Sequence, residues 1–230
     1  MIVGWDPPII SHYLSYRIAA AVAQIGNASV DDQFGGGVRT ELDSHANMCV
    51  LGKHCLLLSE LSTARTVRVG AFSDSAGGLN NVPVVDALIA YDCERTNQVY
   101  LLVLKNALYI EDMDDNLIPP FILRDAGLTV NDKAKIHCED GTATEEDHTI
   151  QEESTGLFIT LQLRSIFSYF PSRKPNNTDL DDGVLVPITP DGPTWNAYDQ
   201  TYADNERSLT NRRGQMCPPK YVQKLSLIHI

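Results

Sequence analysis

Hydrophobic residues recur at helical spacing near the start of the sequence. From Ser11 to Gln24 they return every three or four positions, which predicts a short helix that ends at Gly26. The segment after this glycine is polar and contains three consecutive glycines, a composition typical of flexible linkers. We therefore expect residues 1–37 to be an N-terminal helix followed by a glycine-rich linker.

The pattern changes at residue 38 to short runs that are rich in β-branched and aromatic residues and separated by turn residues. The runs are Met48–Leu51, Thr66–Phe72, Val82–Tyr91, Val99–Leu104 and Ala107–Ile110. Such spacing predicts a small all-β domain over residues 38–130. The stretch between the second and third runs is rich in residues that tolerate positive φ, which predicts an exposed hairpin tip. One helical segment is expected from Pro120, with Gly127 as its C-cap.

The signal weakens after residue 130. An acidic loop precedes one apolar stretch, Leu157–Phe170, which we expect to be an accessory β segment. The tail from Pro171 to Gln223 is rich in Pro, Asn, Asp and Thr, which is the composition of a linker or a partly disordered region. The prediction for residues 131–224 is therefore an accessory β segment and an acidic, proline-rich linker, forming a poorly structured C-terminal extension.

The last six residues, 225–230, read Leu-Ser-Leu-Ile-His-Ile. They reverse-translate to CTG TCT CTT ATA CAC ATC, which resembles the end of a transposase-type sequencing adaptor. We expect these residues to be a sequencing artefact that is not part of the fold, and the natural protein to be longer. The raw nucleotide read tests this, because any other choice of codons would contradict it.

Composition and charge narrow the classes of function. A formal net charge of −12 argues against binding to nucleic acid or to an anionic membrane, because phosphate contacts need clustered Lys and Arg. The five cysteines include no CxxC pair, which is typical of reduced thiols in the cytoplasm. No apolar stretch approaches the roughly 20 residues that span a bilayer, and the start of the sequence lacks a signal-peptide pattern. We therefore expect a protein that is neither secreted nor membrane-spanning.

The residues with the strongest chemical signal lie in a short turn between the glycine run and the first β run. Asp43 is followed by Ser44, whose hydroxyl can bond the local backbone, and then by Ala46, which leaves room for close packing. Taken alone, this pattern is also typical of an Asx turn, in which the carboxylate only bonds its neighbouring backbone. The context has to decide between a chemical and a local structural role.

Several motifs, in order, resemble the protease segment of copia-type retrotransposon polyproteins. In that family an Asp-Ser/Thr-Gly-Ala turn precedes a flap, and a Leu-Tyr-Val-Pro…Asn-Leu-Leu-Ser block closes the domain. Here Asp-Ser-His-Ala at 43–46 resembles the first block, and Ala-Leu-Tyr-Ile at 107–110 with Asn-Leu-Ile at 116–118 resembles the second. Variants of the family that read Glu-Leu-Asp-Ser-His-Ala are closer still to residues 41–46.

The resemblance implies a small, closed, retropepsin-like β domain over residues 38–130. It implies an aspartic endopeptidase of a Gag-Pol-type polyprotein that acts on its own polyprotein within a retroelement particle, without a cofactor. Each chain of such a protease carries one catalytic Asp, so the resemblance implies a homodimer in which Asp43 is contributed twice. Leu117 and Ile118 would pack against the turn, and Ser44 would brace each Asp43 through its hydroxyl. The flap over the peptide would consist of Phe72, Ser73, Asp74, Ser75, Ala76, Gly77 and Gly78.

His45 departs from the family pattern, which has Gly at this place. Glycine there lets the backbone approach its two-fold mate. An imidazole crowds that approach, or alternatively bonds the carboxylate and favours its charged form, which changes the pH optimum without removing the chemistry. Catalytic competence is therefore a separate question from ancestry.

Two other interpretations stay open. The first is a metal site, whose ligands would come from Asp43, His45, Cys49, His54 and Cys55, completed by His137 and Cys138, although this spacing matches no familiar zinc pattern. The second is a catalytically degenerate β module that serves as a structural spacer within the polyprotein. Metal analysis and a peptide-cleavage assay separate these from the protease.

Overall fold

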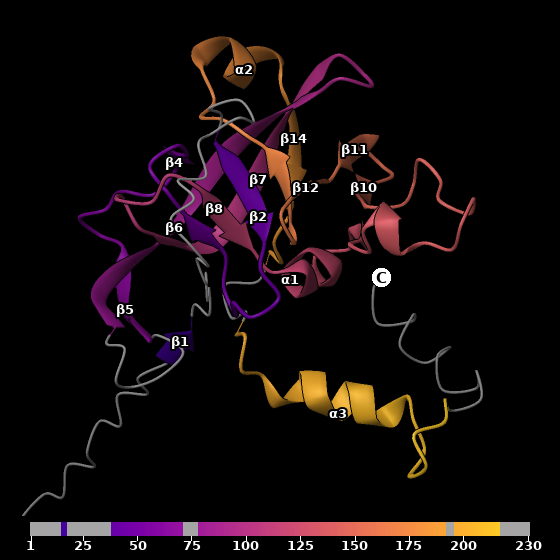
Figure 1. Cartoon of the computed structure of the whole chain (residues 1–230). Helices are drawn as coiled ribbons and strands as arrows, with labels where there is room; N and C mark the ends of the chain where they lie inside the picture. Colours follow the sequence, from indigo (N-terminus) through magenta and orange to yellow (C-terminus); the bar gives the residue numbers. More distant parts are fainter. Residues whose placement is uncertain (1–14, 18–37, 71–77, 192–195, 217–230) are drawn as a thin grey trace, which may run out of the picture. The chain divides into compact units, whose positions relative to one another are not determined.

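The computed structural model describes residues 15–17, 38–70, 78–191 and 196–216 (Figure 1). The chain divides into two compact units, Met1–Asp191 and Gly192–Ile230. The described part of the second unit contains helix α3 (Gln200–Ser208), which begins after Asp199, whose side chain accepts a hydrogen bond from the Thr201 amide. No helix in the described ranges is long and apolar enough to cross a membrane.

Eleven strands of the described residues form one mixed sheet in the first unit (Figure 1). Its path runs β1-β5-β6-β7-β3-β8-β2-β13-β12, while β14 pairs with β7 and β4 pairs with β6. The strands are β1 (Ser15–Arg17), β2 (Arg39–Leu42), β3 (Val50–Leu51), β4 (Leu56–Leu57), β5 (Arg65–Gly70), β6 (Gly78–Cys93), β7 (Gln98–Tyr109), β8 (Asn116–Ile118), β12 (Gln162–Arg164), β13 (Phe167–Pro171) and β14 (Val184–Pro187).

A smaller antiparallel sheet has the order β11-β10-β9. Its strands are β9 (Thr129–Asn131), β10 (Thr149–Glu152) and β11 (Leu157–Thr160). Three short helical segments complete the first unit: α1 (Pro120–Asp125), a 3-10 turn at Lys135–His137 and α2 (Asn177–Asp182). The described chain is thus mostly β with few short helices, as predicted. The two ends of the main sheet, β1 and β12, do not pair among the described strands, so a closed barrel is not observed there.

The long hairpin of β6 and β7 forms the centre of the sheet. Two separate runs were expected from Val99 to Ile110, but the structure has one continuous strand, β7. The register shifts opposite Asn106, which has a φ of 54° and donates its amide to the Asp86 carboxylate at 2.9 Å. This bulge keeps apolar side chains on the buried side of both halves of the strand. Tyr100, Leu102, Leu104 and Ala107 are accordingly fully buried.

Helix α1 confirms the helix predicted from Pro120, but its C-cap is Ala126, and Gly127, the predicted C-cap, follows one residue later. Gly127 has a φ of 92°, which is the left-handed conformation that glycine adopts without a Cβ penalty. The amide of Gly127 donates to the Arg124 carbonyl and the amide of Leu128 donates to the Leu123 carbonyl, each at 3.0 Å. These two bonds are those of a Schellman motif, and Leu123 and Leu128 are both buried.

The N-terminal helix prediction is wrong in the described part of its range. Ser15–Arg17 form strand β1, which pairs in parallel with Arg68–Gly70 of β5. The edge of β5 offers unpaired backbone groups, and a strand added there satisfies them, which local helical periodicity does not reveal. The remaining residues of the predicted helix and the glycine-rich linker lie outside the described residues.

The C-terminal extension is ordered up to Asp191, which corrects the expectation of a poorly structured segment. Strand β13 pairs antiparallel with β2, and β14 pairs in parallel with β7. These strands are short, but they fill open edges of an existing sheet, and Phe170, Val186 and Ile188 are each at most 1% exposed. The domain boundaries placed at residues 37, 130 and 224 remain predictions, and the suspected artefact at 225–230 lies outside the described residues.

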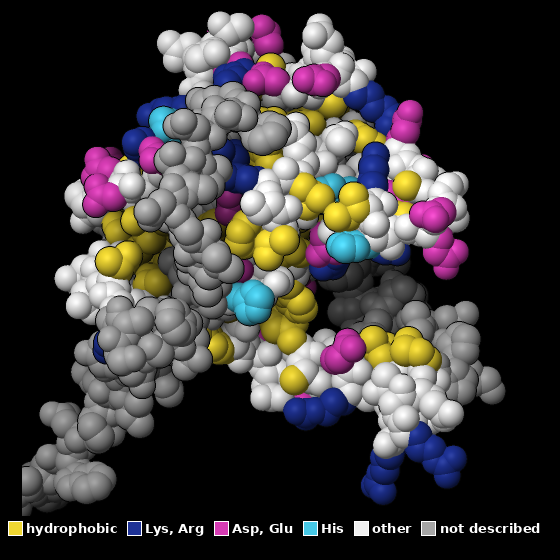
Figure 2. Space-filling model, viewed as in Figure 1, with side chains coloured by type: hydrophobic (Ala, Val, Ile, Leu, Met, Phe, Trp, Pro, Cys, Tyr) yellow, Lys and Arg dark blue, Asp and Glu magenta, His cyan; other side chains and the backbone are white. Residues whose placement is uncertain are grey.

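Charged side chains of both signs are interspersed with hydrophobic ones on the face drawn in Figure 2. Several basic side chains of the first unit pair with acids, as in Lys53 with Asp114 at 2.6 Å and Arg39 with Asp115 at 3.1 Å. Such pairing engages cations that would otherwise be free to contact phosphates.

Candidate functional site

The turn that carries Asp43 begins where strand β2 ends. Strand β2 lies parallel to β8, with Leu42 opposite Ile118. Directly after the strand, the amide of Asp43 donates to the carbonyl of Ile118 at 3.1 Å. The fold thereby brings the acidic turn beside Leu117 and Ile118, which are 7% and 0% exposed. These are the two supporting residues that the family resemblance places against the turn.

The Asp43 carboxylate has one oxygen in a local bond and one without a partner. Oδ1 accepts the amide of His45 at 2.8 Å, which is the bond of an Asx turn. Oδ2 is buried and has no hydrogen-bond partner among the described residues. Leaving a buried carboxylate oxygen unsatisfied costs on the order of 1–3 kcal/mol or more, so such an atom needs an explanation. A local turn alone accounts only for Oδ1.

The three residues after Asp43 differ in exposure and in hydrogen bonding. Ala46 is 7% exposed. The His45 side chain is 75% exposed, and its Nδ1 lies 3.9 Å from Oδ1 of Asp43. The hydroxyl of Ser44 lies 3.4 Å from the same Nδ1, so within this single chain it pairs with His45. The predicted brace from Ser44 to Asp43 is not among the hydrogen bonds of the described turn.

A buried hydrogen-bond network lies close to the turn. The Asn116 side chain accepts the Gly52 amide at 3.0 Å and donates to Oγ1 of Thr40 at 3.2 Å and to Oγ of Ser172 at 3.5 Å. The hydroxyls of Thr40 and Ser172 lie 2.8 Å apart. Thr40 and Asn116 are fully buried and Ser172 is 8% exposed. The network therefore ties β2, β8 and the ends of β3 and β13 together.

Charged groups surround the strand that leads into the turn. Burial is the main cause that raises the pKa of Glu41, and the nearby Asp115 carboxylate adds to it. Asp115 itself accepts the Arg39 backbone amide at 3.0 Å and the Arg39 guanidinium at 3.1 Å. This pairing joins the start of β2 to the loop before β8 and so helps to fix the register of the two strands.

The predicted flap is only partly within the described residues. Gly78 begins β6 and pairs with Gly70 at the end of β5, so the two strands form the antiparallel hairpin that was expected. A Cβ on Gly78 would clash with the Val69 carbonyl, which explains why glycine suits this position. The other flap residues, from Phe72 to Gly77, lie outside the described residues.

The metal-site interpretation is not supported by the described residues. In the ranges that the structure describes, no group of three or more His, Cys, Asp or Glu side chains is placed to hold a metal ion. Cys49 and Cys55 are buried, and burial raises the pKa of the Cys49 thiol to about 12. A protonated thiol is a poor metal ligand. His54 lies instead near Asp114, with Nε2 at 4.0 Å from Oδ1.

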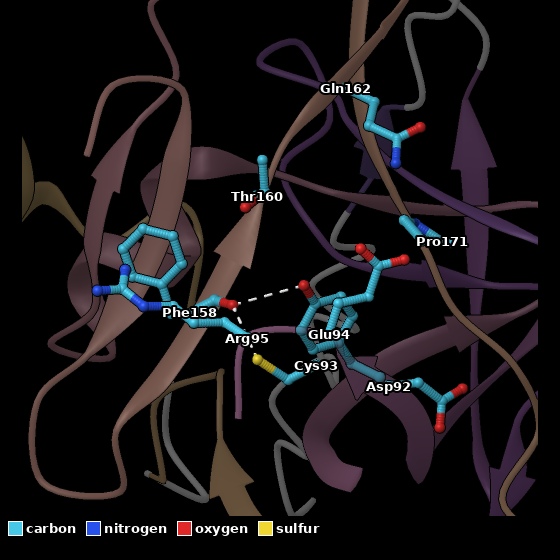
Figure 3. A pocket seen from close by; sticks show the side chains of 9 residues that line it. Asp92, Cys93, Glu94, Arg95, Phe158, Thr160, Gln162 and Pro171 are labelled. Atoms are coloured by element: carbon cyan, nitrogen blue, oxygen red, sulfur yellow. Dashed lines mark hydrogen bonds between the residues drawn. The ribbon is translucent and has the colours of Figure 1, made fainter. Parts of the chain in front are cut away.

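A separate pocket of about 170 Å³ lies where β6 meets the small sheet (Figure 3). The Phe158 carbonyl accepts hydrogen bonds from the Tyr91 hydroxyl and the Cys93 thiol at its wall, and the Arg95 guanidinium lies 4.4 Å from the centre of the Phe158 ring. Its other lining residues are Asp92, Glu94, Thr160, Gln162 and Pro171. None of these residues is among the predicted site residues.

The network of Thr40, Asn116 and Ser172 was not predicted from the sequence. Asn116 stands in the second block of the family resemblance, and this was the one available signal. Thr40 and Ser172 are 132 positions apart, and nothing in the local pattern of either predicts a contact. The sequence therefore indicated the turn and its neighbours but not the buried polar groups that hold them.

Comparisons of the chain with protein-family models, with curated proteins and with solved structures gave no match. The motifs of the sequence and the geometry of the Asp43 turn are therefore the observations that bear on function.

Proposed function

We propose that this chain is a retropepsin-like aspartic endopeptidase of a retrotransposon polyprotein, with Asp43 as its catalytic residue. The observation that carries the proposal is the buried, unpartnered Oδ2 of Asp43 in a turn that β8 holds in place. A carboxylate oxygen withdrawn from water and left without a donor is suited to hold a reacting proton or water. The motif order of the copia-type family supports the same assignment.

The chemistry needs a second carboxylate. Two carboxyl groups a few ångströms apart share one proton, because both cannot ionise cheaply at that separation. One carboxylate then takes a proton from the attacking water as general base, and the other protonates the peptide carbonyl oxygen as general acid. The Oδ2 of Asp43 is the atom available for this proton transfer, since Oδ1 already accepts a hydrogen bond from the His45 amide.

The second carboxylate comes from a second copy of the chain. The sequence contains one Asp-Ser/Thr-x-Ala block, at residues 43–46. A two-fold axis through the paired turns would place the two Asp43 side chains against each other, and the shared proton would satisfy both buried oxygens. The β5–β6 hairpin would cover the bound peptide and exclude water from it. The substrate is the polyprotein from which the protease is released, in the cytoplasm.

A second candidate is a degenerate β module that has lost catalysis. The observation that favours it is His45, which stands where the family has Gly and whose ring lies 3.9 Å from the Asp43 carboxylate. A side chain of this size at the two-fold approach opposes close pairing of the turns. In this case the chain folds and can dimerise, but it does not cleave peptides.

A cleavage assay on a peptide from the polyprotein separates the two candidates. Asp43→Asn removes the general base without a change in size, so the proposal expects cleavage to be abolished while the fold is retained. Asp112→Asn is the matched control, because Asp112 is exposed in the turn between β7 and β8 and its replacement changes the net charge equally. An Asp43→Asn variant that cleaves as fast as this control would overturn the assignment.

A further inference from the structure

The strand that ends in the acidic turn is held by residues from three distant parts of the chain. Thr40 lies three residues before Asp43 on β2, and Asn116 lies two residues before Ile118, whose carbonyl accepts the Asp43 amide. The Asn116 amide group donates to Thr40 Oγ1 at 3.2 Å and accepts the Gly52 amide at 3.0 Å. The Asn116 side chain therefore links β2 to the end of β3 from its position on β8, beside the turn.

Ser172 completes this network from outside the segment that resembles a protease. Its hydroxyl lies 2.8 Å from Thr40 Oγ1, and its amide donates to the Val38 carbonyl at 2.9 Å. Strand β13, which precedes it, pairs with β2 through Tyr169 and Phe170. The C-terminal segment thus covers the side of β2 that β8 leaves open.

We propose that Thr40, Asn116 and Ser172 are positioning residues that fix the Asp43 turn, and that the segment leading to Ser172 is part of the catalytic scaffold. Buried side-chain amides and hydroxyls have strongly directional bonds, so a satisfied network allows one register of β2 against β8. An apolar replacement leaves the Asn116 amide partly unsatisfied and lets the strand shift. The inference rests on the proposed protease function for its kinetic consequence only.

The test compares replacements that remove a hydroxyl with one that keeps it. Thr40→Val keeps the shape of the side chain but removes Oγ1, Ser172→Ala removes the second hydroxyl, and Thr40→Ser restores the first. The matched control is Thr149→Val on β10 of the small sheet, because Thr149 is as fully buried as Thr40 and its hydroxyl donates to the Glu146 carbonyl at 2.6 Å, outside the network. All four variants are made in the full chain.

Two readouts follow. A misplaced carboxylate slows the chemical step more than binding, so Thr40→Val and Ser172→Ala should lower kcat about tenfold or more and change KM less than about twofold. Thr40→Ser should recover most of the loss, and Thr149→Val should behave as the parent does. Amide hydrogen exchange of residues 41–46 should accelerate in Thr40→Val and Ser172→Ala. It should not accelerate in Thr40→Ser or in the control variant.

The exchange readout needs no cleavage, so it judges this inference even if the protein proves inactive. A parent that does not cleave its peptide would refute the proposed function, while faster exchange in Thr40→Val would still support the positioning role. Unchanged exchange and unchanged kcat in Thr40→Val would overturn the inference. If Thr40→Val fails to fold, Ser172→Ala decides in its place by the same two measurements.

Discussion

Replacement of Arg173 by Met should destabilise the first unit, because Arg173 joins the C-terminal segment to the central hairpin. The guanidinium forms two hydrogen bonds of 2.7 Å with the Asp92 carboxylate at the end of β6. It also binds Asp179 of α2, with Nη2 at 2.9 Å from Oδ1. The backbone of Arg173 pairs with Ala90 in both directions, at 2.8 and 3.0 Å. Met keeps the apolar stem and removes only the charged head.

The size of the effect follows from the exposure of each partner. The Asp179 side chain is 6% exposed, so the loss of Arg173 leaves a buried carboxylate whose remaining bond comes from the Asn176 backbone amide in the capping box of α2. Breaking a fully buried pair costs roughly 3–5 kcal/mol, and Arg173 is about a third exposed, so water recovers part of this. Asp92 is 59% exposed and adds roughly 0–1 kcal/mol. We expect a loss of about 2–4 kcal/mol.

Urea unfolding followed by circular dichroism measures this loss as a shift in midpoint at constant m-value. The matched control is Arg124→Met, because Arg124 also pairs with an Asp at 3.1 Å, but both side chains are more than 40% exposed. An exposed pair contributes roughly 0–1 kcal/mol, so the control should lose much less. If Arg173→Met were no less stable than Arg124→Met, the C-terminal segment would not be anchored in the way described.

Three further predictions concern single residues. His45→Gly restores the family turn and should preserve or raise the rate of peptide cleavage, whereas a collapse of the rate would show that the imidazole takes part. Gly52→Ala should cost about 1–3 kcal/mol in urea unfolding, since a Cβ there would clash with the Met113 carbonyl; a neutral effect would contradict this packing. Burial, followed by the charge of Lys135, lowers the pKa of His148, so stability should fall as the pH drops below about 6.5, where the unfolded imidazole takes up its proton first. His148→Asn, which tolerates the φ of 59°, should reduce this pH slope in urea unfolding, and an unchanged slope would refute it.

Elements specified by neighbouring residues could be predicted from the sequence. The β5–β6 hairpin and helix α1 with its terminal Gly127 follow from turn chemistry and capping, which act over a few residues. The turn at Asp43 was also visible as a motif. Its contact with Ile118 was expected only through the family resemblance, because the two residues are far apart in the sequence.

The C-terminal strands could not be predicted from local composition. Val184–Pro187 is four residues long and lies in a segment rich in Asp and Pro, which by itself favours a linker. It becomes a strand because β7 offers an unpaired edge, with Val184 opposite Tyr100. The same holds for the hydrogen bond between Thr40 and Ser172, since short polar side chains acquire this role only when two distant strands meet.

The most direct test of the proposed function is the specific activity of the enzyme as it is diluted. One Asp43 per chain cannot form the carboxylate pair, so activity should require the dimer and specific activity should fall on dilution, in step with dissociation seen by sedimentation. Addition of excess Asp43→Asn chain should inhibit the parent by forming heterodimers with one carboxylate. A monomer whose specific activity stays constant on dilution, and which the Asp43→Asn chain does not inhibit, would contradict the shared site.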